Sequence, residues 1–359
     1  MANILFITPS LSFGGAAKML IFVAESLSAK KHRVCIVNLK NTNTVTDYER
    51  IVQDSISVKY LSSTDAKKQI SEIRKIAKEF GADVIIGFTE KPNAFARIVG
   101  FSLGIPSIMS ERGDPNRTVA PGLKTKIVIK IINSSPGGVF QTEGAREFYG
   151  KGLRNRGVVI PNPIFVVGDI PAVDNSKREK SVVSVARLDN TQKRYDVMLD
   201  AFKLFSDKHA DYVLKLYGKG SDEQLIREWV VERGLEDKVL FMGLTSQPMQ
   251  DTANDGMFLI TSDYEGISNS LLEAMAVGLP CVSTDHTPGG ARLLIQDGEN
   301  GLLAPIGDAR ALADAMCRFA EDPELAARCG NNAKNVVERF SPERIADMWE
   351  DYVLKTCKS

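Results

Sequence analysis

The chain has 359 residues, of which 43% are hydrophobic and 25% are charged, and its 45 Lys and Arg balance 45 Asp and Glu. This length is too great for one ordinary core and suits two soluble globular domains. No apolar run approaches the roughly 20 residues that cross a bilayer, and the first residues lack the basic start of a signal peptide. We therefore expect a cytoplasmic protein.

The zero net charge hides an uneven distribution along the chain. Residues 1–160 carry 23 Lys and Arg against 13 Asp and Glu, whereas the remaining residues carry 22 against 32. A basic half indicates a side that meets an anionic partner, and nucleic acid and an acidic membrane leaflet are the two candidates.

The five cysteines are scattered through the sequence and odd in number. They form no Cys-x-x-Cys pair. We therefore expect neither a disulfide framework nor a zinc site, and most of these side chains should be small buried hydrophobes.

The first half of the chain alternates between apolar runs of strand length and segments with helical periodicity. We expect strands at residues 3–8, 33–39, 56–61, 83–88, 106–110, 138–141 and 157–160, and helices at 16–30, 65–80, 92–103 and 143–149. Such regular alternation predicts a parallel sheet covered by helices on both faces. Gly14 and Gly15 follow the first strand, where glycine lets the backbone approach a ligand at a helix N-terminus.

Breakers and charges at residues 161–163 and 174–180 predict a domain boundary, after which the same pattern starts again. We expect strands at residues 181–186, 212–218, 238–242, 257–261, 280–283 and 300–304, and helices at 196–209, 223–234, after 265, and from about 308 and 323. The sequence thus predicts an N-terminal domain at 1–162 and a second at 163–340. An amphipathic helix at 341–359 is expected to pack on the first domain.

Residues 265–273 stand at the junction between a strand and a helix N-terminus. Backbone N–H groups and the helix dipole favour an anionic ligand there. The carboxylates of Glu265 and Glu273 are good acceptors for sugar and ribose hydroxyls, so the pattern favours a nucleotide-sugar. The alternative is a capping box in which Ser270 and Glu273 only satisfy the start of their own helix, and the segment alone does not separate the two.

Two cations follow the first strand of the second domain. Arg187 and Lys193 can neutralise a diphosphate without a metal ion, and a solvated basic turn is the alternative. Gly218 and Leu244 lie where two further strands end, and their backbone can contact a nucleotide base or simply form turns. No Asp-x-Asp motif, which would hold a divalent ion, lies near a strand end.

Taken in order, these motifs, with Pro161-Asn162-Pro163 and Gly289-Gly290, closely resemble the retaining glycosyltransferases of family 4. Members of that family have the GT-B fold, in which two Rossmann-like domains with parallel sheets face each other across a cleft. The resemblance covers essentially the whole chain, and its most specific part is the spacing of Glu265 and Glu273. It implies a retaining, metal-independent hexosyltransferase that uses a nucleotide-sugar, with uridine as the expected base, and no other cofactor.

The resemblance also implies roles for individual residues. Arg187 and Lys193 would hold the donor diphosphate and stabilise the leaving nucleotide. Glu265 would bind the transferred sugar, and Glu273 the ribose. The other implied donor contacts are Gly14, Gly15, Gly218, Leu244, Gly266, Ile267, Ser268, Asn269, Ser270 and Leu271.

The chain departs from the family pattern in one place. Many members carry a histidine after the strand that corresponds to residues 106–110, and here that place holds Ser110-Glu111-Arg112-Gly113-Asp114-Pro115. The segment resembles a subset of family 4 that acts on bacterial surface and lipid-linked glycans. We expect Glu111, Arg112 and Asp114 to contact the sugar or the acceptor, with Arg112 in the catalytic set. A turn with an internal Arg–Asp pair is the alternative.

Residues 121–130 combine aliphatic side chains with Lys124, Lys126 and Lys130. On the basic half, this segment can lie on anionic lipid and receive a polyprenyl-diphosphate acceptor. An ordinary surface helix is the alternative.

Our hypothesis is therefore a transferase of bacterial surface-glycan synthesis that extends a lipid-linked oligosaccharide at the inner face of the plasma membrane and binds no nucleic acid. A transferase with a soluble acceptor and a non-catalytic two-lobed sugar-binding protein are the alternatives. A dehydrogenase is disfavoured because neither half contains Gly-x-Gly-x-x-Gly.

Overall fold

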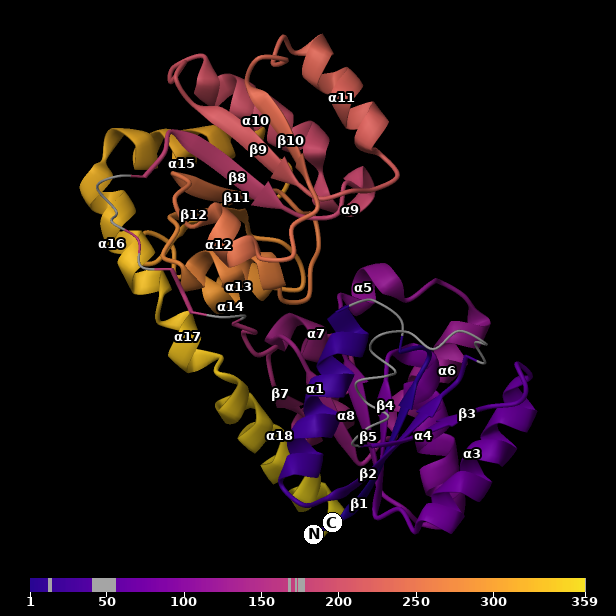
Figure 1. The fold of residues 1–359 in the computed structure, drawn as a ribbon. Helices are drawn as coiled ribbons and strands as arrows, with labels where there is room; N and C mark the ends of the chain where they lie inside the picture. Colours follow the sequence, from indigo (N-terminus) through magenta and orange to yellow (C-terminus); the bar gives the residue numbers. More distant parts are fainter. Residues whose placement is uncertain (12–14, 41–55, 167–168, 172, 174–177, 359) are drawn as a thin grey trace. The chain divides into compact units, whose positions relative to one another are not determined.

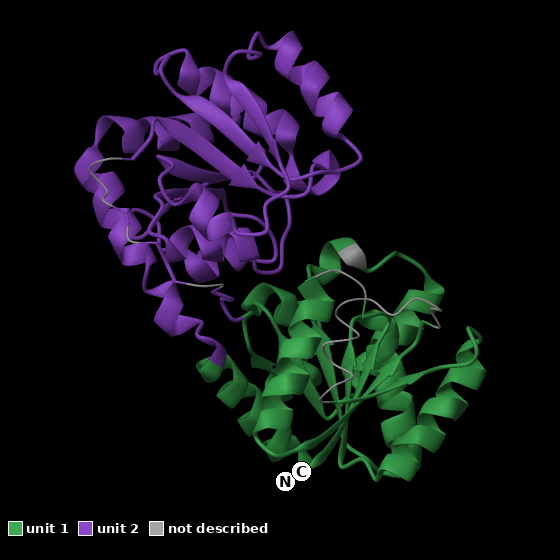
Figure 2. Ribbon diagram, viewed as in Figure 1, with its two compact units in different colours: residues 1–162, 343–359 green, residues 163–342 purple. Residues whose placement is uncertain are grey.

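The computed structural model describes residues 1–11, 15–40, 56–166, 169–171, 173 and 178–358. The chain divides into two compact units (Figure 2), one made of Met1–Asn162 with Glu343–Ser359 and the other of Pro163–Pro342. Each unit is built on a parallel sheet with helices packed against it (Figure 1). The predicted α/β fold class with two parallel sheets is therefore confirmed.

The first unit contains a sheet with the strand order β3-β2-β1-β4-β5-β6-β7. Its strands are β1 (Asn3–Thr8), β2 (Arg33–Asn38), β3 (Ser57–Tyr60), β4 (Val84–Phe88), β5 (Ser107–Glu111), β6 (Gly137–Phe140) and β7 (Val158–Val159). Its helices are α1 (Gly15–Ala29), α3 (Ala66–Phe80), α4 (Glu90–Leu103), α5 (Pro115–Thr118), α6 (Leu123–Asn133), α7 (Glu143–Glu147), α8 (Lys151–Arg156) and α18 (Pro342–Cys357).

Strand β1 shows why helices cover both faces of this sheet. Successive side chains of a strand point to opposite faces. Ile4 and Phe6 therefore pack with Leu20 of α1 on one face, whereas Leu5 and Ile7 pack with α3 and α4 on the other. All four strand residues are fully buried, which is why the strand has a continuous apolar sequence and no alternation.

Helix α18 completes the first unit from the far end of the chain. Trp349 is fully buried and stacks on Phe88, with ring centroids 5.8 Å apart and ring planes 15° apart. The Tyr352 hydroxyl accepts a hydrogen bond from Gly138 N at 2.8 Å and donates one to the Arg156 carbonyl at 2.7 Å. The apolar stripe of this helix is thus buried against the sheet of the first unit.

The second unit contains a sheet with the strand order β10-β9-β8-β11-β12-β13. Its strands are β8 (Ser181–Val185), β9 (Val213–Tyr217), β10 (Val239–Gly243), β11 (Met257–Ile260), β12 (Cys281–Thr284) and β13 (Leu302–Ala304). Its helices are α9 (Asn190–Lys193), α10 (Tyr195–Ser206), α11 (Glu223–Glu232), α12 (Pro248–Thr252), α13 (Asn269–Ala276), α14 (Gly290–Leu294), α15 (Ala309–Glu321), α16 (Pro323–Ala333) and α17 (Val336–Arg339).

The strands and long helices lie within a few residues of the predicted ranges. The helices that sequence analysis missed are α5, α8, α9, α12, α14 and α17, each too short for a helical period to show. The segment at residues 121–130, for which a surface helix was one alternative, forms most of α6. In the described part of the chain, no helix combines the length and the apolar character needed to span a membrane.

Replacing Trp349 by alanine should destabilise the first unit, because the substitution leaves a cavity beside Phe88. We expect the free energy of unfolding to fall by about 3–5 kcal/mol, measured by chemical denaturation followed by circular dichroism. The exposed Asp351 on the same helix is a matched control, and its alanine variant should stay within about 0.5 kcal/mol of the wild type. Equal effects of the two substitutions would show that the aromatic stack does not hold α18 in place.

Candidate active site

The second unit has a topological switch point at the carboxyl ends of β8 and β11. Strand β8 lies between β9 and β11, so the chain runs from β8 through β9 to β10 on one side and then crosses to β11 on the other. In open α/β sheets, the crevice at such a point is where ligands bind. Arg187 follows β8 and Glu265 follows β11, so the strand order brings these two predicted site residues to the same edge.

Lys193 and Glu265 form an ion pair at this edge. Their side chains are only 13% and 12% exposed, so water and salt screen the pair weakly. The Ser262 hydroxyl donates a further hydrogen bond to Glu265 Oε1 at 3.0 Å. The cation that sequence analysis assigned to the diphosphate therefore contacts the carboxylate that it assigned to the sugar.

The turn that carries Lys193 is anchored to the loop that carries Glu265. The Thr261 hydroxyl donates to the Lys193 carbonyl at 2.8 Å, and Asp263 N donates to the Gln192 carbonyl at 3.0 Å. Backbone groups of both segments take part in these bonds. The separation of the two charged side chains is therefore set by the scaffold as well as by their attraction.

Arg194 has a structural role in this scaffold. Its guanidinium bonds Asp196 at 2.9 Å and Asp263 at 3.0 Å. Hydrogen bonds to Asp196 and Asp263 raise the pKa of Arg194, so its charge is permanent and neutralised within the protein. Arg187 differs from it, because its side chain is 64% exposed and lies 3.4 Å from Asp189. Arg187 is the cation more accessible to a ligand.

Helix α13 begins shortly after Glu265 in the chain. Ser268 is its N-cap, and the Ser268 hydroxyl accepts from Leu271 N at 3.4 Å. Because Ser268 is the N-cap, the alternative interpretation, in which Ser270 and Glu273 form a capping box, is wrong. The first turn of α13 offers backbone N–H groups and the positive end of a helix dipole.

Backbone segments pack closely at two places near the predicted donor residues. A Cβ atom on Gly290 would lie 1.7 Å from the Gly266 carbonyl oxygen, and one on Gly218 would lie 1.9 Å from the Ala186 carbonyl oxygen. A side chain cannot be added at either position without moving the backbone. Of the other predicted donor residues, Ile267, Ser268 and Leu271 are buried, Asn269, Ser270 and Glu273 are half-buried, and Leu244 after β10 is exposed.

His286 lies beside this site and was not predicted to take part in it. Its side chain is fully buried, and neither ring nitrogen has a hydrogen-bond partner within the described residues. The ring lies close to Gly290, the first residue of α14. A Cβ atom on Gly290 would lie 3.0 Å from His286 Cε1. Burial lowers the pKa of His286, the Lys193 charge lowers it further, and the Glu265 charge opposes this effect. The imidazole is therefore neutral at pH 7.

The first unit has a pocket of about 320 Å³ beside the carboxyl ends of β4 and β5. Its lining residues are Ala16, Thr89, Glu90, Lys91, Glu111, Arg112, Gly113 and Val119. Thr89 has a φ of 73°, which β-branched residues rarely adopt and which is typical of functional sites. The sequence did not predict Thr89, Glu90 and Lys91 as pocket residues. The strained backbone of Thr89 cannot be recognised from the residue types.

Glu111 and Arg112 reach this pocket from the end of β5. The Glu111 carboxylate accepts from the Tyr149 hydroxyl at 2.6 Å and from Gly113 N at 3.1 Å. Burial raises the pKa of Glu111 and lowers the pKa of Arg112 to about 9. Arg112 donates to Asn162 Oδ1 at 2.7 Å, so both side chains are held in place by the protein itself.

Asp114, from the same predicted segment, serves the turn. It is almost fully buried and caps α5 by accepting from Asn116 N at 3.0 Å. It is not among the described residues that line the pocket. The contact of Asp114 with a sugar or an acceptor therefore stays a prediction, and the alternative is that Asp114 only caps α5.

The glycine turn after β1 is described only in part. Gly15 is the first residue of α1, and the next residue, Ala16, lines the pocket. Nothing lies within 4 Å of a Cβ atom built on Gly15, so the helix start borders open space. Gly14 lies outside the described residues.

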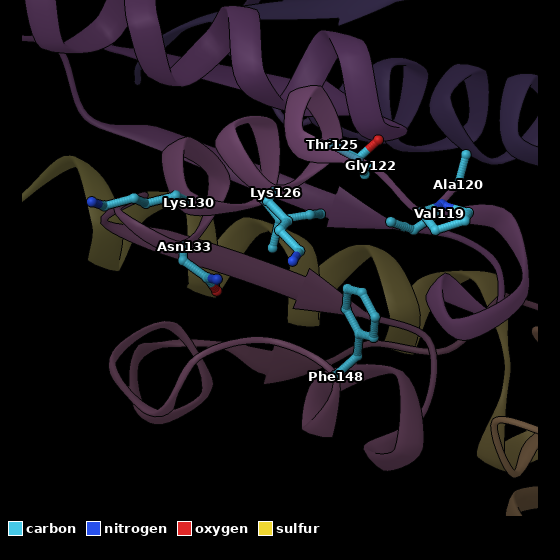
Figure 3. Close-up of a pocket in the computed structure, with 10 residues that line it drawn as sticks. Val119, Ala120, Gly122, Thr125, Lys126, Lys130, Asn133 and Phe148 are labelled. Atoms are coloured by element: carbon cyan, nitrogen blue, oxygen red, sulfur yellow. The ribbon is translucent and has the colours of Figure 1, made fainter.

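A second pocket in the first unit, of about 420 Å³, lies along α6 (Figure 3). Its lining residues are Val119, Ala120, Pro121, Gly122, Thr125, Lys126, Ile129, Lys130, Asn133 and Phe148. The Lys126 side chain points to the side of the pocket where Phe148 lies (Figure 3). Leu123 and Ile127 of α6 are 76% and 53% exposed. Lys126 and Lys130 thus border an apolar surface. Lys124, the third lysine of the predicted segment, is not among the described residues that line this pocket.

Comparison with known proteins bears on both units. Residues 169–336 match the family model described as "Glycosyl transferases group 1". The chain is 22% identical to an uncharacterized glycosyltransferase of Haemophilus influenzae over 94% of this chain and 96% of that protein. It is 25% identical, over 97% of both chains, to the "GalNAc-alpha-(1->4)-GalNAc-alpha-(1->3)-diNAcBac-PP-undecaprenol alpha-1,4-N-acetyl-D-galactosaminyltransferase" of Campylobacter jejuni.

Among solved structures, the fold is similar to that of Anabaena Alr3699/HepE in complex with UDP. The TM-score is 0.84 at 20% identity, and the match covers 98% of this chain and 100% of that one. This likeness confirms the GT-B fold that the sequence motifs predicted.

Stability should depend on pH through His286. Its pKa is lowered in the folded protein, so below its ordinary value of about 6.5 the unfolded chain binds a proton there that the folded protein does not. The free energy of unfolding should fall as the pH drops from about 6.5, with a contribution from His286 of at most about 1.4 kcal/mol per pH unit. His286→Gln should reduce this slope in denaturation experiments between pH 8 and 5. A slope equal to that of the wild type would contradict the proposed neutral state.

Proposed function

We propose that this chain, which carries a glycosyl transferases group 1 domain at residues 169–336, moves a hexose from a UDP-sugar to a lipid-linked oligosaccharide with retention of configuration. The main support for the donor half of this proposal is the ion pair of Lys193 and Glu265 at the switch point of the second unit. A cation, a carboxylate and a nearby helix N-terminus are the groups that recognise a diphosphate joined to a sugar.

Lys193 and Glu265 neutralise each other when no donor is bound. A diphosphate carries more negative charge than one carboxylate, so it attracts the Lys193 ammonium and the Arg187 guanidinium. Glu265 then becomes available to accept hydrogen bonds from the sugar hydroxyls. When the donor binds, the ion pair of Lys193 with Glu265 is replaced by one of Lys193 with the diphosphate. The Glu265 carboxylate is then free to bind the sugar of the same donor.

The same groups serve the transfer step. Negative charge develops on the diphosphate as the bond to the sugar breaks, and Arg187, Lys193 and the first turn of α13 stabilise that charge. The leaving phosphate takes the proton of the acceptor hydroxyl on the face from which it departs. This route retains the configuration of the sugar and needs no metal ion in the donor site.

Uridine is the proposed base. The Anabaena protein of similar fold was solved in complex with UDP, which supports this choice. Gly218 and Leu244, after β9 and β10, are proposed to border the base, and Glu273 to bind the ribose. Backbone groups of residues 266–271 are proposed to contact the phosphates and the sugar, and Gly15 to lie under the diphosphate.

The acceptor is proposed to bind the first unit. The Campylobacter jejuni relative is named for an acceptor linked to undecaprenol through a diphosphate, which supports the same chemical class here. Glu111 and Arg112 would meet the sugar end in the smaller pocket. The apolar surface of α6, with Lys126 and Lys130, would meet the lipid and its phosphates at the membrane surface.

The donor site can be tested by calorimetric titration with UDP in EDTA. The wild type should bind one UDP per chain, and Arg187→Ala should weaken binding by about 1.5–3 kcal/mol, the range for a charge-assisted hydrogen bond. Glu265→Gln should preserve UDP binding and abolish most sugar transfer, because the amide keeps the shape of the carboxylate and loses its charge. Transfer is measured with a UDP-sugar and a lipid-linked acceptor.

The matched control is Arg310→Ala, which removes an exposed cation at the start of α15 and should leave UDP binding unchanged. Sugar transfer at the wild-type rate by Glu265→Gln would overturn the role of that carboxylate. Failure of the wild-type protein to bind any nucleoside diphosphate would overturn the donor site.

Membrane binding can be tested by co-sedimentation with vesicles that contain anionic phospholipid. The wild type should bind, and binding should fall as salt rises, because the attraction is electrostatic. Each lysine near an anionic surface contributes about 1 kcal/mol, so the double variant Lys126→Ala/Lys130→Ala should bind about 30-fold more weakly. The double variant Lys67→Ala/Lys68→Ala on α3 removes the same charge elsewhere on the first unit and should bind like the wild type. Salt-independent binding would contradict the role of the lysines, and the absence of binding would favour a soluble acceptor.

A further inference from the structure

The second unit brings together three side chains that could hold a metal ion, away from the residues assigned to the donor. They are His209, which follows α10, and Cys317 and Glu321, which lie one helical turn apart in α15. Their ligand atoms all lie within 4.8 Å of one another. Cys317 and Glu321 share one face of α15, because residues four apart are neighbours on a helix.

The distance between the nitrogen and oxygen ligand atoms matches that of a tetrahedral metal site. His209 Nε2 and Glu321 Oε1 are 3.3 Å apart. Zinc bonds of roughly 2.0–2.2 Å to nitrogen and oxygen, at a tetrahedral angle, separate two such ligands by roughly 3.3–3.5 Å. A sulfur ligand, with a zinc bond of about 2.3 Å, would lie roughly 3.6 Å from the other two ligand atoms. The Cys317 sulfur lies within 4.8 Å of both, so a shift of at most about 1 Å would complete the site.

The surroundings hold the imidazole in position for such a role. The His209 ring stacks on Phe205, with ring centroids 4.9 Å apart, and meets the edge of Tyr212 at 6.1 Å. Cys317 is buried, whereas the Glu321 side chain is 62% exposed, so the cluster is open to solvent on one side. A metal ion could enter from that side and keep a water molecule as its fourth ligand.

We propose that His209, Cys317 and Glu321 form a zinc site that joins the turn after α10 to α15 and is independent of the donor site. One thiolate, one imidazole and one carboxylate form a donor set that suits zinc. On binding, a Zn–S bond replaces the S–H bond of Cys317, and the proton leaves to solvent. Because the thiol has to lose its proton when it binds a metal ion, zinc should bind more tightly as the pH rises.

The site is tested with EDTA-stripped protein titrated with Co²⁺ and then with Zn²⁺. The wild type should bind one Co²⁺ per chain and develop the charge-transfer absorption of a thiolate–cobalt bond, which Zn²⁺ then removes. Cys317→Ser should lose this absorption. Cys357→Ser, which removes a half-buried cysteine of the first unit, is the matched control and should keep it.

Cys317→Ser changes a buried residue and could impair folding. Glu321→Gln avoids this problem, because the Glu321 side chain lies largely in solvent. It should weaken Co²⁺ binding by at least about tenfold, with the UDP affinity unchanged. The absence of a thiolate–cobalt absorption in the wild type, or its survival in Cys317→Ser, would overturn the proposal and leave His209 and Glu321 as an ordinary hydrogen-bonded pair. Unchanged Co²⁺ affinity in Glu321→Gln would overturn the assigned ligand set.

Discussion

The attraction between Lys193 and Glu265 is the interaction on which the proposed donor site depends. Two opposite charges with little access to water are stable only as a pair, because burying one without the other is costly. The surrounding bonds follow from that constraint. The Thr261 hydroxyl donates to the Lys193 carbonyl and Asp263 N donates to the Gln192 carbonyl, so the two charged segments are held together. Arg194 is neutralised by Asp196 and Asp263, so it does not compete for Glu265.

The two pockets described above in the first unit differ in chemistry. The smaller pocket contains the internally bonded Glu111 and Arg112 beside the strained backbone of Thr89. The larger one is mostly apolar, with lysines at its border. Polar groups that the protein already holds in place suit sugar hydroxyls, because little ordering remains to be done when the ligand arrives. An apolar surface bordered by cations suits a lipid phosphate.

Much of this architecture could be predicted from the sequence, since buried parallel strands are continuous apolar runs and long helices show their period. The motifs also identified Arg187, Lys193 and Glu265, which share one sheet edge. Other features depend on contacts between distant segments. The choice of Ser268 as the cap of α13, the burial of His286 and the approach of His209 to Cys317 have no local signature. Cysteine spacing reports only neighbours in sequence, so it could not show the three side chains of the proposed zinc site.

The first unit is discontinuous in the chain, and this has a consequence for its biosynthesis. The ribosome makes β1 to β7 first, but Phe88 acquires its stacking partner Trp349 only after all of the second unit has been made. At about 5–20 residues per second, the apolar face that awaits α18 stays uncovered for roughly 10–40 s. The second unit has no such delay, since its residues are contiguous. In the cell, the half that emerges first would therefore be the last to mature, and chaperones would meet its open face during that interval.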